Sequence, residues 1–146
     1  CSIGAILAGV NGNSIAALGN FGMKIGTAFQ LTDDTLDYVA EEEEFGKAIG
    51  MDLKEGKITL PLIHALRHCS KKEKELIKSA VLNENLQPGE TKEILGLIQK
   101  YRGIEYSLEK AGSLVSEAKA ILDAFPDSEA RQSLLAVSDF VTKRKL

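Results

Sequence analysis

Apolar residues recur every three or four positions from Ser14 to Val39, which is the pattern of one face of an α-helix. The positions that share this spacing are Ile15, Leu18, Phe21, Ile25, Ala28, Phe29 and Leu36. A helix over this stretch would be about 39 Å long at ~1.5 Å per residue. Three glycines interrupt it, at positions 19, 22 and 26, and each costs up to ~1 kcal/mol relative to alanine. We therefore expect another backbone to approach this helix closely.

The rest of the chain also carries helical signals, and no stretch alternates apolar and polar residues as a strand does. The predicted helices are 2–9, 14–39, 59–68, 70–82, 91–101, 104–124 and a last one capped by Asp127 or Ser128. Ser14, Thr59 and Ser70 are the predicted N-caps, and Ser70 forms a capping-box pattern with Glu73. Residues 40–58 are predicted to form a loop and residues 86–90 a turn. These signals predict an all-α fold.

The composition excludes several classes of function. A net charge of −3, with no basic stripe among aromatic residues, gives no reason to expect a nucleic-acid partner. Cys1 and Cys69 are too few for a disulfide framework, which indicates a reduced, cytoplasmic protein. No apolar run reaches the length of a membrane span, and the basic cluster at residues 143–145 supports at most peripheral membrane contact.

Three aspartates, Asp33, Asp34 and Asp37, lie within five residues near the end of the long predicted helix. Asp33 and Asp37 are four residues apart and share one helix face, where like charges cost about 0.2–0.5 kcal/mol. Acids near a helix C-terminus also oppose the macrodipole, by ~0.3–1 kcal/mol each. Mg²⁺ would compensate for this charge, because it prefers carboxylate, water and phosphate oxygens. The alternative, a solvated acidic face, suits Glu41–Glu44 better than the aspartates, whose apolar neighbours indicate packing.

Three lysines follow the aspartates in the predicted loop, at positions 47, 54 and 57. Lys47 and Lys57 come directly after glycines. Lysine side chains act as point charges toward phosphate oxygens, and metal ions neutralise other oxygens of the same group. Aspartates followed by loop lysines therefore favour a metal-dependent diphosphate site.

The segment from Phe29 to Pro61 contains "FQLTDDTLDY" and then "GKAIGMDLKEGKITLP". It resembles the second aspartate-rich motif and following loop of the trans-polyprenyl diphosphate synthases, and the similarity continues through "GIEYSLEKAGSLVSEAKAIL". The resemblance implies the isoprenoid synthase fold, an antiparallel helix bundle. It also implies a prenyltransferase that condenses an allylic diphosphate with isopentenyl diphosphate. Mg²⁺ would be the cofactor, with Mn²⁺ as a substitute, and the full-length protein would be a homodimer.

The same resemblance assigns roles to individual residues by position. Asp33 would be the principal metal ligand, and Asp34 and Asp37 would bind metal more distantly or through water. Phe29 and Gln30 would lie near the substrates. Lys47 and Lys57 would contact the allylic diphosphate. Asp52 would orient neighbouring groups.

The family's first aspartate-rich motif has no counterpart in the sequence, and the chain begins at Cys1 within an apolar helix pattern. We therefore expect a fragment, the C-terminal portion of a longer synthase. It would be one all-helical unit, with the metal and diphosphate half at 1–68 and C-terminal helices at 69–146. We expect this fragment alone to be inactive. The length of the product cannot be read from it, because residues around the first motif largely set the pocket floor in this family.

Three alternatives remain open at this point. The chain could belong to a non-catalytic helical subunit of a heteromeric prenyl synthase. It could also come from a terpene cyclase of the same fold, although the glycine-lysine loop argues against that. Finally, His64 and His68 have zinc-compatible spacing, but with no third ligand nearby we favour a surface or partly buried pair.

Overall fold

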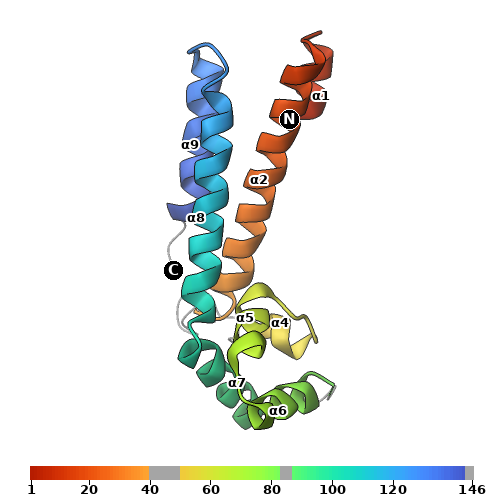
Figure 1. Ribbon diagram of the computed structural model, residues 1–146, viewed down its shortest axis with the longest axis vertical. Helices are drawn as coiled ribbons and strands as arrows, with labels where there is room; N and C mark the ends of the chain where they lie inside the picture. The colour runs from red at the N-terminus through yellow and green to blue at the C-terminus, as the bar shows by residue number, and fades with distance from the viewer. Residues whose placement is uncertain (40–49, 83–86, 144–146) are drawn as a thin grey trace. The chain divides into compact units, whose positions relative to one another are not determined.

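The computed structural model describes residues 1–39, 50–82 and 87–143, and all regular structure within these residues is helical (Figure 1). The helices are α1 Ser2–Leu7, α2 Gly12–Leu36, α4 Met51–Lys54, α5 Leu60–His68, α6 Lys71–Val81, α7 Pro88–Lys100, α8 Gly103–Leu122 and α9 Glu129–Lys143. The all-α prediction is confirmed for this part of the chain. None of the described helices is long and apolar enough to cross a membrane.

The described residues form two compact units. The first contains residues 1–32 and 109–143, and the second contains residues 33–108. The boundary predicted at residue 68 does not coincide with an edge of either unit. The functional division into 1–68 and 69–146 stays a prediction.

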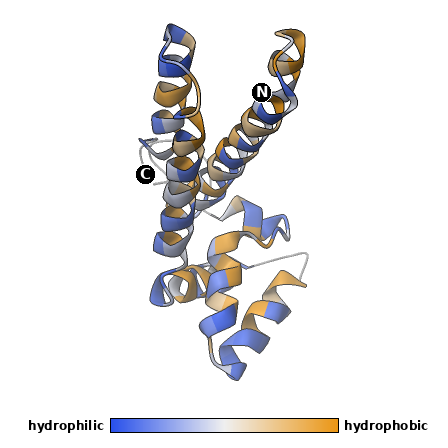
Figure 2. Ribbon diagram, turned by 45° about the horizontal axis from the view of Figure 1, so that its top comes forward, coloured by the Kyte–Doolittle hydropathy of each residue, from blue (hydrophilic) through white to orange (hydrophobic). Residues whose placement is uncertain are grey.

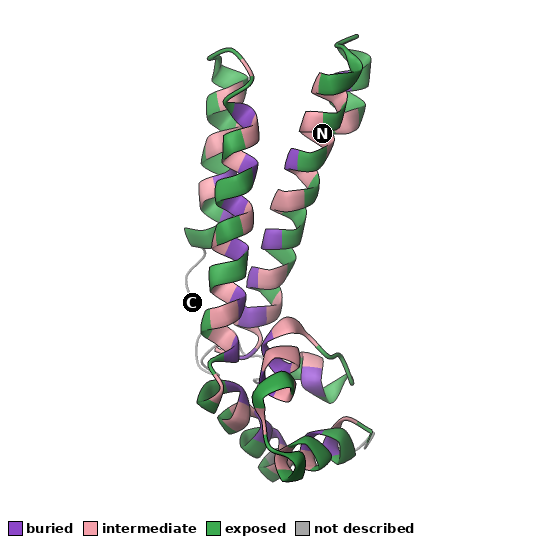
Figure 3. Ribbon diagram, viewed as in Figure 1, coloured by how far each residue is buried: buried purple, intermediate pink, exposed green. Residues whose placement is uncertain are grey.

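In the first unit, α2, α8 and α9 enclose a core of buried aliphatic and aromatic side chains (Figure 3). Ala28 of α2 shares one cluster with Ala111 of α8, while Phe21 shares another with Leu122. Rising numbers in α2 thus pair with falling numbers in α8, so the two helices are antiparallel. In Figure 1, α9 (blue) runs antiparallel along α8 (cyan).

The start of α1 packs against glycines of α2. A Cβ added to Gly19 would lie 2.6 Å from Ser2 Oγ, and one added to Gly22 would lie 3.0 Å from Cys1 Sγ. The atoms that approach these two glycines belong to side chains, so the expected approach of another backbone is not found there among the described residues. Gly26 has nothing within 4 Å of the same position, so the expectation is wrong there for the described residues.

Hydrogen bonds of the first unit correct one predicted helix cap and decide between two others. The backbone N–H of Ser14 donates to Asn11 Oδ1 at 2.9 Å, so Asn11, not Ser14, caps α2. At the other end of the unit, Ser128 Oγ accepts from the Arg131 N–H at 3.2 Å, which selects Ser128 between the two predicted caps of α9. Arg131 Nε also donates to the Leu122 carbonyl at 2.9 Å, and this satisfies an orphan acceptor at the end of α8.

The second unit has its own core, to which residues 33–39 and helices α4–α7 all contribute. Its buried members are Tyr38, Leu53, Leu62, Ala65, Ile77, Ala80, Ile94 and Ile98. Figure 2 shows the amphipathic pattern of α6, with hydrophilic residues along its outer side. Two predictions are wrong here: residues 51–54 of the predicted loop form α4, and α7 begins at Pro88, inside the predicted turn.

Gly103 opens α8 at a position where no larger residue fits. Arg102 before it adopts the left-handed conformation, with a φ of 56°. A Cβ on Gly103 would lie 2.3 Å from the carbonyl oxygen of Pro61 in α5. The backbone cannot swing away as a side chain can, so the turn between α7 and α8 requires glycine.

Glu73 joins the start of α6 to the end of α7. Within the capping box, Glu73 Oε2 accepts from the Ser70 N–H at 2.8 Å while Ser70 Oγ accepts from the Glu73 N–H. The same carboxylate accepts from Lys100 Nζ at 2.7 Å and from the Tyr101 hydroxyl at 2.8 Å. The Lys100 hydrogen bond, followed by those from Ser70, lowers the pKa of Glu73 to about 2 from an ordinary 4.5.

Replacing Gly103 with Ala tests the close approach to Pro61. We expect the free energy of unfolding in urea to fall by about 2–3 kcal/mol, because the added methyl group overpacks against backbone atoms. Gly112→Ala is the matched control in the same helix, since nothing lies within 4 Å of its added Cβ. That variant should gain up to ~1 kcal/mol from helix propensity. Equal effects from both substitutions would contradict the contact.

The contribution of Glu73 to stability should depend on pH. Because its folded-state pKa lies below the unfolded value, its contribution is full above pH 4.5 and is lost as the pH falls toward about 2. We expect Glu73→Gln to be less stable at neutral pH and to lack this component of acid unfolding, followed by circular dichroism. Glu75→Gln, whose carboxylate pairs with Lys78 on the exposed side of α6, should retain it.

Candidate functional site

The three aspartates predicted to bind metal all lie in the second unit, at and just beyond the end of α2. Asp33 is exposed, and Asp34 and Asp37 are half-buried. Solvent therefore reaches all or part of each of these side chains. The oxygen atoms of Asp37 accept hydrogen bonds from the protein backbone.

Asp37 holds the segment that follows residues 40–49. Its carboxylate Oδ2 accepts from the backbone N–H of Asp52 at 3.0 Å, and its carbonyl oxygen accepts from the Gly50 N–H at 3.0 Å. Burial raises the pKa of Asp37 above its ordinary value, although the hydrogen bond from Asp52 opposes the shift. These contacts cap the first turn of α4 and tie it to the residues after α2.

The neighbouring residue, Tyr38, provides a second tie. Its hydroxyl forms a 2.7 Å hydrogen bond with Thr59 Oγ1, the N-cap residue of α5. Burial, the main cause, raises the pKa of Tyr38 to about 12, so the phenol stays protonated at neutral pH. Thr59 is at the predicted cap position, but its hydroxyl bonds Tyr38 and makes no side-chain capping hydrogen bond to α5.

Glycines in the left-handed conformation flank α4 on both sides. Gly50 has a φ of 74° and Gly56 a φ of 73°, values that favour glycine over any other residue. Leu53, only 1% exposed, anchors the short helix in the core. The turn at Gly56 then brings Lys57 back toward the start of α4, where its N–H donates to the Asp52 carbonyl at 2.8 Å.

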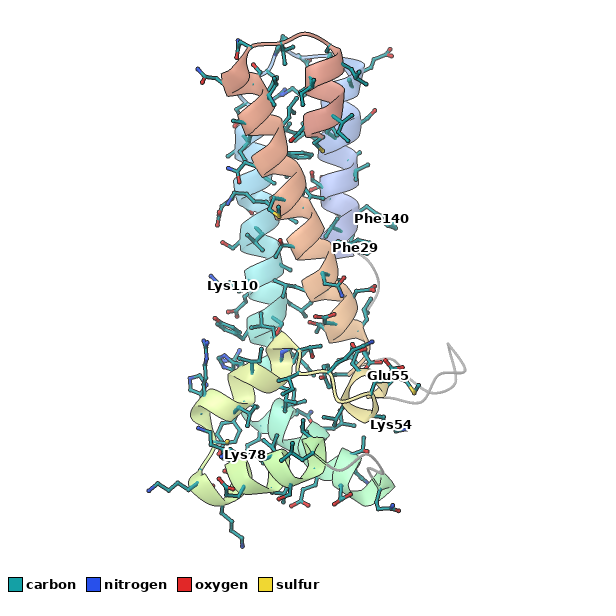
Figure 4. All side chains as sticks on the ribbon, turned by 90° about the vertical axis from the view of Figure 1, so that its right-hand side faces the viewer. Phe29, Lys54, Glu55, Lys78, Lys110 and Phe140 are labelled. Carbon is teal, nitrogen blue, oxygen red and sulfur yellow. The ribbon has the colours of Figure 1, made fainter. Side chains whose placement is uncertain are left out.

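Lys57 acts electrostatically on Asp37 and pairs with two carboxylates of its own segment. Its Nζ lies 2.8 Å from Glu55 Oε2 and 3.0 Å from Asp52 Oδ1, and the side chain is 57% exposed. Hydrogen bonds to Glu55 and then to Asp52 raise its pKa above the ordinary value, so the amine is charged at all physiological pH values. Figure 4 labels Glu55 and Lys54 in this part of the chain.

The carboxylates suit a hard divalent cation in chemistry but do not form a complete site. Oxygen donors of this kind bind Mg²⁺, which also keeps waters and takes phosphate oxygens. Within the described residues, no three acidic, histidine or cysteine side chains come close enough to hold a metal ion. A metal at Asp33 and Asp34 would therefore need further ligands from water, a phosphate group or other residues.

The remaining predicted residues belong to the first unit or lie outside the described residues. Phe29, which is 41% exposed and labelled in Figure 4, and Gln30, also exposed, belong to the portion of α2 in the first unit. Lys47 lies outside the described residues. Their roles stay predictions.

The two histidines occupy a different part of the second unit. The His64 ring stacks on Tyr106 with centroids 4.1 Å apart, and His68 Nδ1 lies 2.8 Å from the His64 carbonyl oxygen. Burial, ahead of the neighbouring cations, lowers the pKa of His64. His64 is half-buried and His68 exposed, and no third ligand lies close among the described residues. The rings of the two histidines pack against each other, and one residue is half-buried and the other exposed, as favoured from the sequence.

Comparison with known protein families identifies the family of this chain. The family model described as "Polyprenyl synthetase" matches residues 1–98, about two thirds of the chain. The chain belongs to the polyprenyl synthetase family.

Two curated relatives show how far the similarity extends. The short chain isoprenyl diphosphate synthase of Methanothermobacter thermautotrophicus is 39% identical over 145 residues, which is 97% of this chain and 43% of that protein. The octaprenyl diphosphate synthase of Escherichia coli is 35% identical over 95% of this chain and 43% of its own length. The chain thus spans less than half the length of these relatives.

Solved structures of polyprenyl synthases share its fold. The polyprenyl synthase of Caulobacter crescentus, complexed with calcium and isoprenyl diphosphate, matches with a TM-score of 0.86 and 34% identity over 99% of this chain and 44% of its own. The geranylgeranyl pyrophosphate synthase of Bacteroides thetaiotaomicron matches with a TM-score of 0.89 and 29% identity over 98% and 47%. The all-α isoprenoid synthase fold expected from the resemblance is confirmed.

The sequence pattern does not indicate two interactions near the predicted site. Glu55 pairs with Lys57, and the Tyr38 hydroxyl fixes Thr59. The only signal available was the pair of glycines, Gly50 and Gly56, which bracket a short apolar-anchored turn. That signal predicts a tight local structure but not which side chains meet in it.

Asp37→Ala should lower the local stability of α4 more than the stability of the rest of the chain. The substitution leaves the amide of Asp52 without its acceptor, at a cost of about 1–2 kcal/mol. We expect hydrogen exchange of the Asp52 amide, followed by NMR, to accelerate by roughly five- to thirtyfold. The matched control is Asp33→Ala, and equal acceleration in both variants would show that Asp37 does not hold this helix.

Proposed function

We propose that this chain forms the second aspartate-motif half of a trans-prenyltransferase. The reaction joins an allylic diphosphate to isopentenyl diphosphate. The allylic carbon loses diphosphate, forms a bond to the terminal alkene carbon of isopentenyl diphosphate, and a proton then leaves the condensed product. One observation supports the proposal: the exposed Asp33 at the end of α2 belongs to the same unit as Lys57, which pairs with Asp52, the residue whose N–H donates to Asp37.

The relatives support this chemistry. They are named as synthases of isoprenyl diphosphates, and the Caulobacter crescentus structure and one from Corynebacterium glutamicum are described as complexes with calcium and isoprenyl diphosphate. Their names give several products, including octaprenyl and geranylgeranyl diphosphates, so no product length is proposed for this chain.

Asp33 and Asp34 would hold Mg²⁺, with Mn²⁺ as a substitute and Asp37 contributing through water. When bound, the cation neutralises diphosphate oxygens and so favours departure of this group as an anion. The exposed position of Asp33 leaves it accessible to a ligand that brings phosphate oxygens.

Lys57 would supply a positive charge to the same diphosphate. Its present partners are carboxylates, so an incoming diphosphate must compete with Glu55 and Asp52 for the amine. Asp52 would stay as the anchor, because its backbone also accepts the Lys57 N–H. Lys47 would act as a second cation, and Phe29 and Gln30 would lie along the substrate, as the family pattern predicts.

A second candidate, a subunit of a heteromeric synthase, has one specific support. The Bacillus subtilis relative, 36% identical over 99% of this chain, is named heptaprenyl diphosphate synthase component 2. Copurification decides between the two: a homodimer of the full-length protein supports the first proposal, and a stable complex with a different chain supports the second.

We place the protein in the cytoplasm, because both cysteines are free thiols.

Asp33→Ala should lower turnover in the full-length protein that carries this sequence. Loss of a metal ligand removes electrostatic stabilisation of the leaving diphosphate, for which we expect a decrease in kcat of roughly 10²–10³-fold. The measurement is incorporation of labelled isopentenyl diphosphate with farnesyl diphosphate as the allylic substrate. Asp139→Ala, which removes an acid that pairs with Lys119 in the first unit, is the control and should leave kcat within twofold. Unchanged turnover in Asp33→Ala would overturn the metal assignment.

The 146-residue chain alone should be inactive in the same assay. Its described residues bring together too few acidic side chains to hold a metal ion by themselves, and it spans less than half of its relatives. Incorporation of isopentenyl diphosphate above the no-enzyme background, at any Mg²⁺ concentration, would contradict this expectation.

A further inference from the structure

Residues 54–58 form an exposed segment between two residues that the second unit holds in place. Every residue of the segment is exposed, and Lys57 lies near its end. On the N-terminal side the segment follows Leu53, which is only 1% exposed. On the C-terminal side Thr59 is half-buried, and its hydroxyl oxygen lies 2.7 Å from the hydroxyl oxygen of Tyr38. The position of the Lys57 amine therefore depends on what holds these two sides.

Two consecutive residues, Asp37 and Tyr38, hold the two sides of this segment. The Asp37 carboxylate accepts from the backbone N–H of Asp52 at 3.0 Å, which ties the first turn of α4 to the residues after α2. Tyr38 bonds Thr59, two residues beyond Lys57. Both residues belong to the aspartate motif or follow it directly. The stretch that carries the predicted metal ligands thus also holds both sides of the segment that carries Lys57.

Tyr38 is a firm support for Thr59. Its side chain is 6% exposed and belongs to the core of the second unit, together with Leu53 and Leu62. Close packing in the core leaves the ring little freedom to follow Thr59 if that residue moves. Burial raises the pKa of the Tyr38 hydroxyl to about 12, so the group stays neutral at physiological pH and can donate or accept in this bond.

Helix capping does not account for the hydroxyl of Thr59. A threonine at an N-cap ordinarily accepts from a backbone N–H of the helix. Thr59 makes no such bond to α5, and its hydroxyl bonds Tyr38. Two residues of extended chain span at most about 7 Å, so a displacement of Thr59 is carried to Lys57.

We propose that Tyr38 is a positioning residue for Lys57: its hydroxyl holds Thr59, and Thr59 keeps the Lys57 amine where a diphosphate can bind it. The identity of the ligand rests on the proposed function. Tyr38 acts through Lys57 in this account, so its effect on binding must disappear when the amine is removed.

The first test is calorimetric titration with inorganic pyrophosphate in the presence of Mg²⁺. Tyr38→Phe removes only the hydroxyl, and we expect it to weaken binding by about fivefold, the size of effect that one hydrogen bond gives. The same substitution added to Lys57→Ala should change the affinity by less than about twofold, because residues that act as one unit are not additive. Equal weakening by Tyr38→Phe with and without the amine would overturn the proposal.

Tyr101→Phe is the matched control. It also removes a tyrosine hydroxyl that forms a side-chain hydrogen bond in the second unit, to Glu73 at 2.8 Å. We expect it to lower the melting temperature as Tyr38→Phe does, while its affinity for pyrophosphate stays within about twofold of the wild type. If both variants lose affinity equally, general destabilisation is the cause and the proposal fails.

The second test needs no ligand. The Lys57 N–H donates to the Asp52 carbonyl at 2.8 Å, so its hydrogen exchange reports whether the segment is held. We expect this exchange, followed by NMR, to accelerate by about fivefold in Tyr38→Phe and to be unchanged in Tyr101→Phe. Unchanged exchange in Tyr38→Phe would contradict the positioning role.

The two tests distinguish failure of this inference from failure of the proposed function. If the wild type does not bind pyrophosphate with Mg²⁺, or if Lys57→Ala binds as tightly as the wild type, the proposed role of Lys57 is wrong. The exchange of the Lys57 amide still decides whether Tyr38 holds the segment. If Lys57→Ala loses affinity and Tyr38→Phe does not, the proposed function stands and the inference about Tyr38 is wrong.

Discussion

The hydrogen bond from the Asp52 backbone to the Asp37 carboxylate organises the candidate site. It fixes the first turn of α4 against the residues that follow α2, and the turn at Gly56 then brings Lys57 back to Asp52. The bond from the Gly50 N–H to the Asp37 carbonyl and the bond between Tyr38 and Thr59 tie the same segment to the residues after α2. The local penalty of crowding three acids is thus partly offset, since one of them caps a helix.

Charge competition is the second constraint on the site. Lys57 has two carboxylates within 3.0 Å, and its side chain is exposed. In the proposed site, a diphosphate would offer oxygens to a metal at the aspartates and would compete with Glu55 for the amine. The exposed pair of Lys57 and Glu55 is weak enough to be exchanged, since ion pairs on a surface contribute little to stability.

Local signals predicted most of the helices, and tertiary contacts account for what they missed. Ser70 and Glu73 form the capping box that their spacing indicates, because both partners lie within one turn. The additional partners of Glu73, and the bond between Tyr38 and Thr59, join residues more than twenty positions apart, and no local pattern encodes them. The short helix α4 was missed because four residues carry too little periodicity to distinguish a helix from a loop.

The central claim is that the aspartates and Lys57 form one diphosphate-binding group. The most direct measurement is calorimetric titration of the protein with inorganic pyrophosphate, with and without Mg²⁺, in the wild type and in Asp33→Asn with Asp34→Asn. The account predicts that Mg²⁺ tightens binding by at least tenfold in the wild type and has no such effect in the double variant. An equal effect of Mg²⁺ on both proteins, after correction for its binding to pyrophosphate, would contradict it.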